Sequence, residues 1–283
     1  MARKKKSTYP IEHWSYSSLL SFLRNPLAWH KRYVERIYDI PAGPAAAIGR
    51  AGHKALEHFY STKNPTRADK ERAIGMGLAY LQAIPDFEIN FGVAKSLRAQ
   101  KVKRKKMEEE YLRAIGYYLK RAPRHDVRGV EVMGLAKVPG IPLPIKAVSD
   151  LVVTSPSNPG ALDIIDHKFV DSFSELGGAN PLFTLQALFN YYTVQSEYEM
   201  PIKRFIFQEC KKKKNRNGKS QMRRHVIHFD ECQDDFALFH RLLKDATDEI
   251  GRPRAYLPNP SDMFEGKDSF EIYRMDLINP STT

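Results

Sequence analysis

Two apolar segments, each interrupted by charged residues, place the strongest limit on how this chain can fold. The first, Ala-Val-Ser-Asp-Leu-Val-Val at 147–153, contains Asp150; the second, Ala-Leu-Asp-Ile-Ile-Asp-His-Lys at 161–168, contains Asp166 and Lys168. Their length and aliphatic content predict two neighbouring β-strands. In a strand, residues two apart lie on the same face, roughly 6.6 Å along the chain. Asp166 and Lys168 are therefore expected side by side.

These charges require a compensating partner. Burying a carboxylate or an ammonium costs several kcal/mol per ion unless an interaction offsets the loss of hydration. A divalent cation held by Asp150 and Asp166 would offset it, and Lys168 would then be free to face a phosphate. This combination indicates a nuclease site. Asp163, on the other face of the second strand, is expected to begin that strand at the surface.

The remaining pattern predicts helices on both sides of a short run of strands. A serine at 15–18 is expected to cap the first helix, which Pro26 interrupts, and Pro41–Pro44 is expected to be a loop. The further helices are expected at 48–60, 66–90, 96–121, 181–196 and 236–250. The strands are expected at 130–138 and 143–154 (a hairpin), 162–170, 202–208 and 225–229.

This order predicts an α/β fold: a central mixed β-sheet flanked by helices, with an N-terminal helical region. We expect a basic disordered arm at 1–10 and one domain over 11–283. Within that domain the helical part covers about 11–122, the sheet core about 128–230, and the C-terminal helix and tail 231–283.

The composition of the chain indicates which class of partner it binds and in which compartment it works. The net charge is +12, with 45 Lys and Arg against 33 Asp and Glu. Basic surface gains free energy by releasing the counterions condensed on nucleic acid, so a polyanionic partner is favoured. No apolar run approaches the roughly 20 residues of a membrane span, and no apolar stretch follows the basic N-terminus. Two cysteines make no disulfide framework. We expect a cytoplasmic protein without a membrane partner.

Five motifs follow one another in the order Trp-Ser-Tyr-Ser-Ser-Leu-Leu-Ser-Phe-Leu-Arg-Asn-Pro at 14–26, Gly-Arg-Ala-Gly-His at 49–53, Asp150, Asp-His-Lys at 166–168, and Gln186. In this order they resemble the PD-(D/E)xK nuclease superfamily, and within it the RecB-like exonuclease branch. The resemblance covers about residues 14–205. The resemblance implies a restriction-endonuclease-like core.

The resemblance also implies roles for these residues. His53, Asp150, Asp166 and the backbone carbonyl of His167 would coordinate the metal, which oxygen ligands plus one imidazole identify as Mg²⁺ or Mn²⁺. Lys168 would activate the water and screen the developing charge, and Gln186 would hold the water or the phosphate. Two roles are open to Glu131, which heads the first hairpin strand: an outer ligand of the metal or an ordinary strand residue.

The sequence departs from this family at two points. Many relatives carry four cysteines that bind an iron–sulfur cluster, but Asn25 occupies the first of those positions and no cysteine follows Cys232. No iron–sulfur cluster is therefore expected. The family's glutamine is usually followed four residues later by a tyrosine, and here that position is Asn190.

Two basic runs are candidates for contacts with DNA phosphates. The first is a predicted helix around Lys103 and Arg104, for which a solvated helix face is the alternative. The second is the predicted loop between two strands, where a mobile arm that grips phosphates is expected. Its basic residues are Lys211, Lys212, Lys213, Lys214, Arg216, Lys219, Arg223 and Arg224.

We therefore predict a metal-dependent deoxyribonuclease, an exonuclease acting on DNA ends in recombination, repair or the processing of phage or CRISPR DNA. The alternatives are a structure-specific or nicking endonuclease on the same fold, a catalytically silent DNA-binding subunit, and RNA as the substrate. The candidate protein partners are a helicase, a single-strand annealing protein or a CRISPR adaptation protein. The expected setting is the cytoplasm of a bacterial or phage-infected cell, in association with the nucleoid.

Overall fold

The computed structural model describes residues 9–37, 41–175, 181–215 and 220–259. Residues 1–8 of the predicted basic arm and most of the C-terminal tail lie outside the described residues. The chain divides into two compact units, which are described separately. The first comprises 1–39, 135–147 and 234–283, and the second 40–134 and 148–233. The expectation of one domain over 11–283 stays a prediction.

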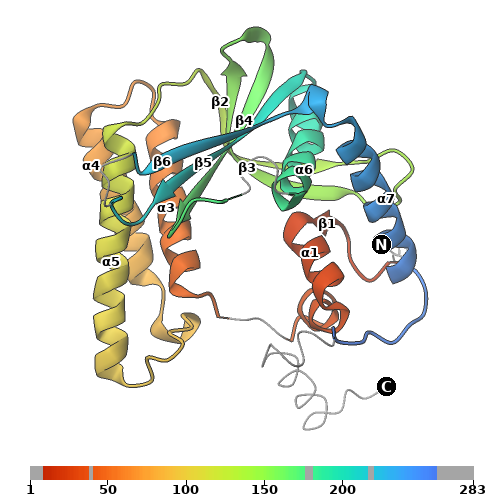
Figure 1. The fold of residues 1–283 in the computed structure, drawn as a ribbon, viewed down its shortest axis with the longest axis horizontal. Helices are drawn as coiled ribbons and strands as arrows, with labels where there is room; N and C mark the ends of the chain where they lie inside the picture. Colours follow the sequence, from red (N-terminus) through yellow and green to blue (C-terminus); the bar gives the residue numbers. More distant parts are fainter. Residues whose placement is uncertain (1–8, 38–40, 176–180, 216–219, 260–283) are drawn as a thin grey trace, which may run out of the picture. The chain divides into compact units, whose positions relative to one another are not determined.

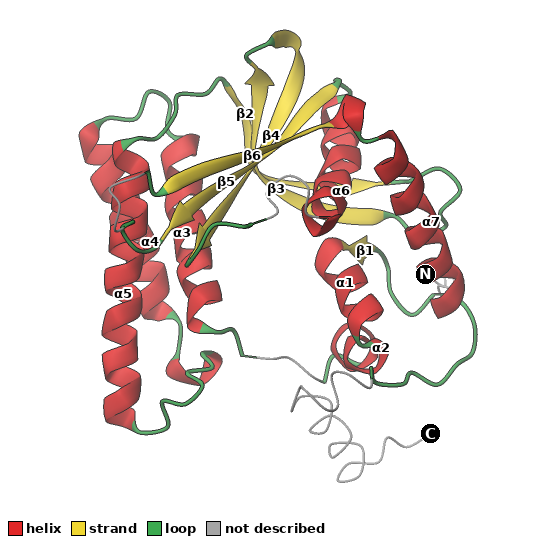
Figure 2. Ribbon diagram, viewed as in Figure 1, coloured by secondary structure: helices red, strands yellow, loops and turns green. Residues whose placement is uncertain are grey.

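The sheet is mixed, as predicted (Figure 2). Its order is β1-β3-β4-β5-β6, and β2 pairs with β3. Strands β3 and β4 are antiparallel, β4 and β5 parallel, and β5 and β6 antiparallel. The strands are β1 (Trp14–Ser15), β2 (Val127–Ala136), β3 (Ile145–Ser155), β4 (Asn158–Val170), β5 (Ile202–Lys211) and β6 (Met222–His228).

The helices follow the predicted order (Figure 1). They are α1 (Tyr16–Arg24), α2 (Pro26–Trp29), α3 (Pro44–Ser61), α4 (Arg67–Ala83), α5 (Leu97–Lys120), α6 (Pro181–Tyr198) and α7 (Gln233–Ile250). A π-helical turn at His30–Val34 and 3₁₀ turns at Asp86–Glu88 and Phe229–Glu231 complete the regular structure of the described residues.

Two helix boundaries differ from the prediction for reasons that involve proline. The helix expected from residue 48 begins at Pro44, whose fixed φ suits the first helical position. The helix expected to reach residue 90 ends at Ala83, before Pro85, because a proline disfavours helical backbone in the residue ahead of it. The predicted capping serine is Ser15, whose hydroxyl accepts from the backbone N–H of Ser18 at 3.2 Å.

The first unit is built around aromatic residues of the segment at 14–29. The rings of Trp14 and Trp29 stack with centroids 5.7 Å apart, and Phe22 packs against both. The indole of Trp14 donates to the hydroxyl of Thr247 on α7 at 2.9 Å. The described part of the chain contains no helix that is long and apolar enough to cross a membrane.

In the second unit, α3, α4 and α5 cover one face of the sheet. Leu151 and Ile165 belong to the core that these helices share with the strands. The next residues along, Val152 and Ile164, lie on the opposite face, where Phe183 of α6 stacks on Phe207 of β5 with centroids 4.2 Å apart. The strands that carry Asp150 and Asp166 are therefore enclosed from both sides.

Candidate metal centre and active site

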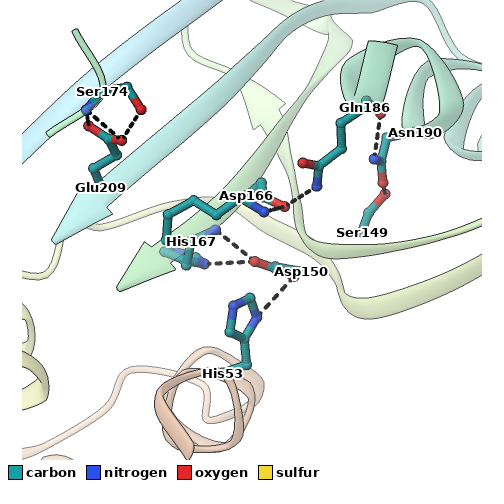
Figure 3. Close-up of polar contacts among 10 residues, drawn as sticks. His53, Ser149, Asp150, Asp166, His167, Ser174, Gln186, Asn190 and Glu209 are labelled. Atoms are coloured by element: carbon teal, nitrogen blue, oxygen red, sulfur yellow. Dashed lines mark hydrogen bonds and ion pairs between the residues drawn. The ribbon is translucent and has the colours of Figure 1, made fainter. Parts of the chain in front are cut away.

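The candidate site of the second unit is built from His53 of α3, Asp150 of β3, Asp166 of β4 and Gln186 of α6 (Figure 3), together with Glu131 of β2. Nδ1 of His53 lies 3.2 Å from Oδ1 of Asp150. Ligand atoms of His53, Glu131 and Asp150 all lie within 4.8 Å of one another, the only such group of three or more His, Cys, Asp or Glu in the described part of the chain. The structure thus brings the predicted ligands His53 and Asp150 together with Glu131, the candidate outer ligand, while the predicted ligand Asp166 is not one of this group of three.

On β4, Asp166 and Lys168 lie two residues apart and on the same face of the strand, as predicted. Nζ of Lys168 lies 3.1 Å from Oδ1 and 2.8 Å from Oδ2 of Asp166. The side-chain amide of Gln186 donates to the same Oδ1 at 2.8 Å. Asp166 is buried, with 6% of its surface exposed. Three of the four predicted catalytic residues, Asp166, Lys168 and Gln186, are therefore in direct contact, and their catalytic roles stay predictions.

His167 ties the two strands together at the site. Its backbone N–H donates to Oδ2 of Asp150 at 2.7 Å. Its ring Nε2 lies 2.9 Å from the hydroxyl of Tyr118 on α5, which in turn lies 2.7 Å from the hydroxyl of Tyr60 on α3. This buried chain of polar groups fixes β4 against two helices. The role predicted for the His167 carbonyl stays a prediction.

Electrostatics separate the two aspartates. Burial alone would raise the pKa of Asp150, but the charge of His53 and the hydrogen bonds from His167 and His53 hold that pKa well below its usual range. Burial raises the pKa of Asp166 above its ordinary value, against the opposing charge of Lys168. Burial lowers the pKa of His53, but the charge of Asp150, its hydrogen bond with His53 and the charge of Asp166 together outweigh burial and raise the pKa to about 9.

Glu131 is held in an unusual backbone conformation. Its φ is 49°, in the left-handed region that costs a residue with a β-carbon about 1–2 kcal/mol. Such strain clusters at functional sites. Burial and the neighbouring charge of Asp150 raise the pKa of Glu131 to about 7. A carboxylate pressed toward other carboxylates fits a cation, so the residues present are suited to the divalent metal that the sequence predicts.

Glycines allow the helices to approach these strands closely. A β-carbon on Gly52, next to His53, would overlap the ring of Phe169 on β4. A β-carbon on Gly134 of β2 would lie 2.7 Å from the β-carbon of Thr193 on α6. Only glycine fits at these two contacts, and the first of them sets the distance between His53 and β4.

Several residues that support the site were not singled out from the sequence. Asn190, which replaces the family's tyrosine, accepts from the hydroxyl of Ser149 at 2.7 Å and donates to the carbonyl of Gln186 at 2.9 Å. It therefore links α6 to β3 beside Asp150. The signal was present, since Asn190 lies four residues after Gln186 and hence on the same helix face.

A buried acid on β5 holds the segment that follows β4. Glu209 accepts from the hydroxyl of Ser174 at 2.7 Å and lies 2.9 Å from Nε2 of His225. The backbone N–H of Ser174 also donates to this carboxylate at 3.2 Å. The hydroxyl of Ser174 bonds to Glu209 and not to the imidazole of His225, so this serine is not arranged as a nucleophile activated by a histidine base. The three residues instead anchor a loop.

The structure corrects the expectation for Asp163. It was expected at the surface, but it is completely buried, and its carboxylate binds the guanidinium of Arg204. Parallel pairing places Asp163 opposite Arg204 on β5. The guanidinium of Arg204 compensates the buried charge of Asp163 in place of water.

The predicted DNA-binding residues differ in their surroundings: Lys214 lines a pocket, and Arg224 on β6 lies opposite Gln208. Arg216 and Lys219 lie outside the described residues. Several others already hold parts of the protein: Lys103 donates to the carbonyl of Phe91 at 2.7 Å, and Arg104 to that of Leu81 at 2.9 Å. The remaining contacts join Lys211 to Asn215, Lys212 to Asp171, Lys213 to Glu110, and Arg223 to the carbonyl of Ser174. DNA binding by these residues stays a prediction.

Comparison with known proteins gives a family and a fold. No protein of curated function matches the sequence. The crystal structure of a "Putative exonuclease" from Eubacterium rectale is similar, with a TM-score of 0.55 and 14% identity over 99% of this chain and 100% of that one. A second solved structure, SSO0001, gives a TM-score of 0.34 and 13% identity over 94% of each chain.

The family model decides the assignment. The model of the PD-(D/E)XK nuclease superfamily matches residues 13–263, which include every residue of the candidate site. The mixed sheet flanked by helices confirms the predicted restriction-endonuclease-like architecture. The chain belongs to the PD-(D/E)XK nuclease superfamily.

Proposed function

We propose that this protein is a divalent-metal-dependent deoxyribonuclease and that it degrades DNA from its ends. The convergence of His53, Glu131 and Asp150 beside the Asp166–Lys168 pair carries the proposal. These groups bring a cation site and a fixed ammonium to one place, which is the combination that phosphodiester hydrolysis requires. A catalytically silent DNA-binding subunit would have no chemical use for buried charges of this kind.

The metal would be held by His53, Glu131, Asp150 and Asp166, with the His167 carbonyl as a further ligand. Carboxylate oxygens suit Mg²⁺ and Mn²⁺ alike, and the imidazole favours Mn²⁺. A divalent ion bound there lowers the pKa of a water molecule and polarises the scissile phosphate.

The chain's own residues supply the remaining steps. Lys168, whose Nζ lies 2.8 Å from Asp166, would orient the attacking water and offset negative charge as it develops on the phosphate. Gln186 fixes the Asp166 carboxylate through its 2.8 Å hydrogen bond and leaves its carbonyl oxygen for the water. The charge of His53 and the hydrogen bonds from His167 and His53 keep Asp150 ionised in the metal-free protein, so its carboxylate would be available to a metal without losing a proton, whereas His53 would bind as the neutral imidazole.

Substitution of the two charged strand residues tests the chemistry. Asp150→Ala and Lys168→Ala should each abolish cleavage of linear DNA, while binding of DNA persists. Lys203→Ala, a partly exposed lysine of β5, is the matched control and should cleave like the unaltered protein. Circular dichroism establishes that each variant is folded. Equal degradation after Asp150→Ala or Lys168→Ala, or in the presence of EDTA, contradicts the proposal.

The mode of attack is tested with DNA of different forms. End-labelled linear duplex, single-stranded DNA and closed circles are incubated in Mg²⁺ and in Mn²⁺. An exonuclease shortens linear DNA from one end and spares the circles. Nicked circles would instead assign the endonuclease alternative, and cleavage of RNA alone would remove DNA as the substrate.

The setting follows from the substrate. With DNA as the substrate, we propose that the protein acts in the cytoplasm of a bacterial or phage-infected cell. A helicase, a single-strand annealing protein or a CRISPR adaptation protein as a partner stays a prediction.

A further inference from the structure

A pocket of about 460 Å³ lies between the last turns of α5 and the residues Lys214, Asn215 and Gln221, which follow β5 and precede β6. Figure 1 shows the end of β5 beside α5. None of the candidate metal ligands lines this pocket. The described residues that line it are Arg113, Gly116, Tyr117, Lys120, Arg121, Lys214, Asn215 and Gln221.

One wall of the pocket is a single face of α5. Arg113, Tyr117, Lys120 and Arg121 follow one another at intervals of four, three and one residues, which places them on adjoining turns. A β-carbon on Gly116 would have no atom within 4 Å, so the space above this residue is open. The negative end of the helix dipole accounts for Lys120 and Arg121 but not for Arg113.

The opposite wall is held in place by hydrogen bonds. The backbone N–H of Gln221 donates to the hydroxyl of Tyr117 at 3.1 Å, and its side chain donates to the carbonyl of Lys211 at 3.0 Å. The amide of Asn215 donates to the carbonyl of Ser220 at 2.7 Å. The guanidinium of Arg121 lies 4.0 Å from the centre of the Tyr117 ring. These contacts hold the described residues of the lining in place without a ligand.

The cations of this pocket have no acidic partner among the described residues. Within the part of the chain that the structure describes, no carboxylate lies within 4.0 Å of a cationic nitrogen of Arg113, Lys120, Arg121 or Lys214. By contrast, the neighbouring Lys212 and Lys213 each approach an acid, Asp171 and Glu110 respectively. Cations gathered on a pocket without counter-charge create a local positive potential that attracts an anion.

Phosphate is the anion that this lining fits best. The planar guanidinium groups of Arg113 and Arg121 match the paired oxygens of a phosphate, and the two lysines add point charges. The aromatic face of Tyr117 already holds Arg121, which keeps that guanidinium in one orientation. Most contacts between proteins and DNA go to backbone phosphates and sugars.

We infer that this pocket binds a backbone phosphate of the DNA substrate at a point distinct from the metal centre. The inference rests on the proposed function and adds a second anchoring point to it. Tyr117 lines the pocket, and the next residue, Tyr118, bonds to His167 of the active site at 2.9 Å. One helix turn therefore connects the phosphate pocket to the strand that carries the catalytic residues.

The test compares two double variants with equal change in charge. Arg113→Gln with Lys120→Gln removes two cations from the pocket. Lys95→Gln with Arg98→Gln removes two exposed cations from the start of the same helix, where Arg98 lies roughly 33 Å from Lys120 along the axis. The affinity for a labelled duplex is measured in EDTA and phosphate-free buffer between about 50 and 200 mM salt.

The pocket variant should bind the duplex at least about tenfold more weakly at low salt. Its slope of log K against log salt should become shallower by about 0.9 for each DNA phosphate that the variant no longer neutralises. The control should keep the slope of the unaltered protein. Equal weakening in the two variants would reduce the effect to net charge and overturn the inference. Unchanged DNA binding, with weaker binding of a labelled nucleoside triphosphate or of inorganic polyphosphate, would assign the pocket to a small ligand and also overturn it.

The nuclease assay keeps this inference separate from the proposed function. If the pocket variant has a shallower salt slope than the unaltered protein, but the unaltered protein cleaves no nucleic acid, the proposed function fails and the phosphate pocket stands. If the unaltered protein cleaves DNA in an Asp150-dependent way while the pocket variant binds normally, the pocket fails and the function stands.

Discussion

The amide of Gln186 and the ammonium of Lys168 contact the same carboxylate, Asp166, from opposite elements of the fold. Gln186 donates from α6 at 2.8 Å, and Lys168 approaches along β4 at 2.8 and 3.1 Å. A carboxylate fixed from two sides keeps one orientation toward a cation, and residues that orient ligands in this way are worth about 10–100-fold in metal affinity or activity.

Gln186→Leu should therefore lower the turnover number about 10–100-fold, because the Asp166 carboxylate loses one of its two supports. Gln195→Leu, an exposed glutamine of the same helix, is the matched control. Steady-state cleavage of linear DNA at saturating substrate checks this, with DNA affinity measured in EDTA. A Gln186→Leu variant as fast as Gln195→Leu would show that the glutamine is only a satisfied polar residue.

Glu131→Gln should weaken the binding of Mn²⁺ by about 10–100-fold, because a neutral amide replaces one of the carboxylates near His53 and Asp150. A 100-fold weakening removes up to about 2.7 kcal/mol of metal-induced stabilisation. Thermal unfolding at increasing Mn²⁺ concentration measures this without any need for catalysis.

The control for Glu131 is Glu57→Gln on α3. Glu57 is ion-paired with Lys54 at 2.8 Å and is not one of the three clustered residues. Its substitution should leave the Mn²⁺-induced shift unchanged. Shifts of equal size in Glu131→Gln and in the unaltered protein would remove Glu131 from the metal centre and return it to the role of an ordinary strand residue.

Local pattern predicted the strands of the site and the faces of their residues. The side chains around Asp150 and Asp166 alternate between the two faces of the sheet as predicted. Both strands are enclosed, and a shift of one residue in their pairing would turn the wrong side chains toward each face. The period of the strand alone placed Lys168 beside Asp166. His53 was predicted from the family resemblance and not from helical or strand periodicity, because no local sequence pattern distinguishes a metal-binding histidine from a structural one.

What the sequence missed depends on pairing between distant segments. Asp163 was expected at the surface because an acid at the start of an apolar run is typical of a strand end. Its partner Arg204 lies 41 residues away on a parallel neighbour, a pairing that no local pattern contains. The role of Glu131 could not be decided from the sequence. Its left-handed φ interrupts the alternation that assigns strand side chains to one face or the other, and no sequence pattern shows that interruption. Lys103 and Arg104 resembled a DNA-binding run, but both bond to backbone carbonyls.

Gly52→Ala should separate His53 from the strands. The added β-carbon would overlap the Phe169 ring, so the ring or α3 must shift, and we expect α3 to move at a cost of about 1–3 kcal/mol in stability. Metal affinity should fall together with stability because the neighbouring His53 moves with the helix. Gly49→Ala is the control: its β-carbon meets nothing within 4 Å, and it should stabilise the helix by about 0.5–1 kcal/mol.

The double variant Gly52→Ala with Phe169→Leu tests the cause. A smaller side chain at 169 leaves room for the β-carbon, so part of the metal affinity should return, which two independent effects would not produce. Urea unfolding and Mn²⁺ titration measure the two quantities. If Gly52→Ala is as stable as Gly49→Ala and binds Mn²⁺ normally, the close approach of α3 to β4 does not set the geometry of the site.

His125 should make the stability of the protein depend on pH. Burial, followed by the charges of His167 and Arg224, lowers the pKa of His125 from 6.5 to about 4. Between these two values the unfolded chain binds the proton and the folded chain does not, so the free energy of unfolding rises with pH. This contribution is fully present above pH 6.5 and is lost as the pH falls toward 4. His125→Gln should flatten this slope by on the order of 1–2 kcal/mol across the interval, and His228→Gln, an exposed histidine of β6, should not. Urea unfolding followed by circular dichroism in EDTA measures both, and identical slopes in the two variants would show that His125 is not buried in its neutral form.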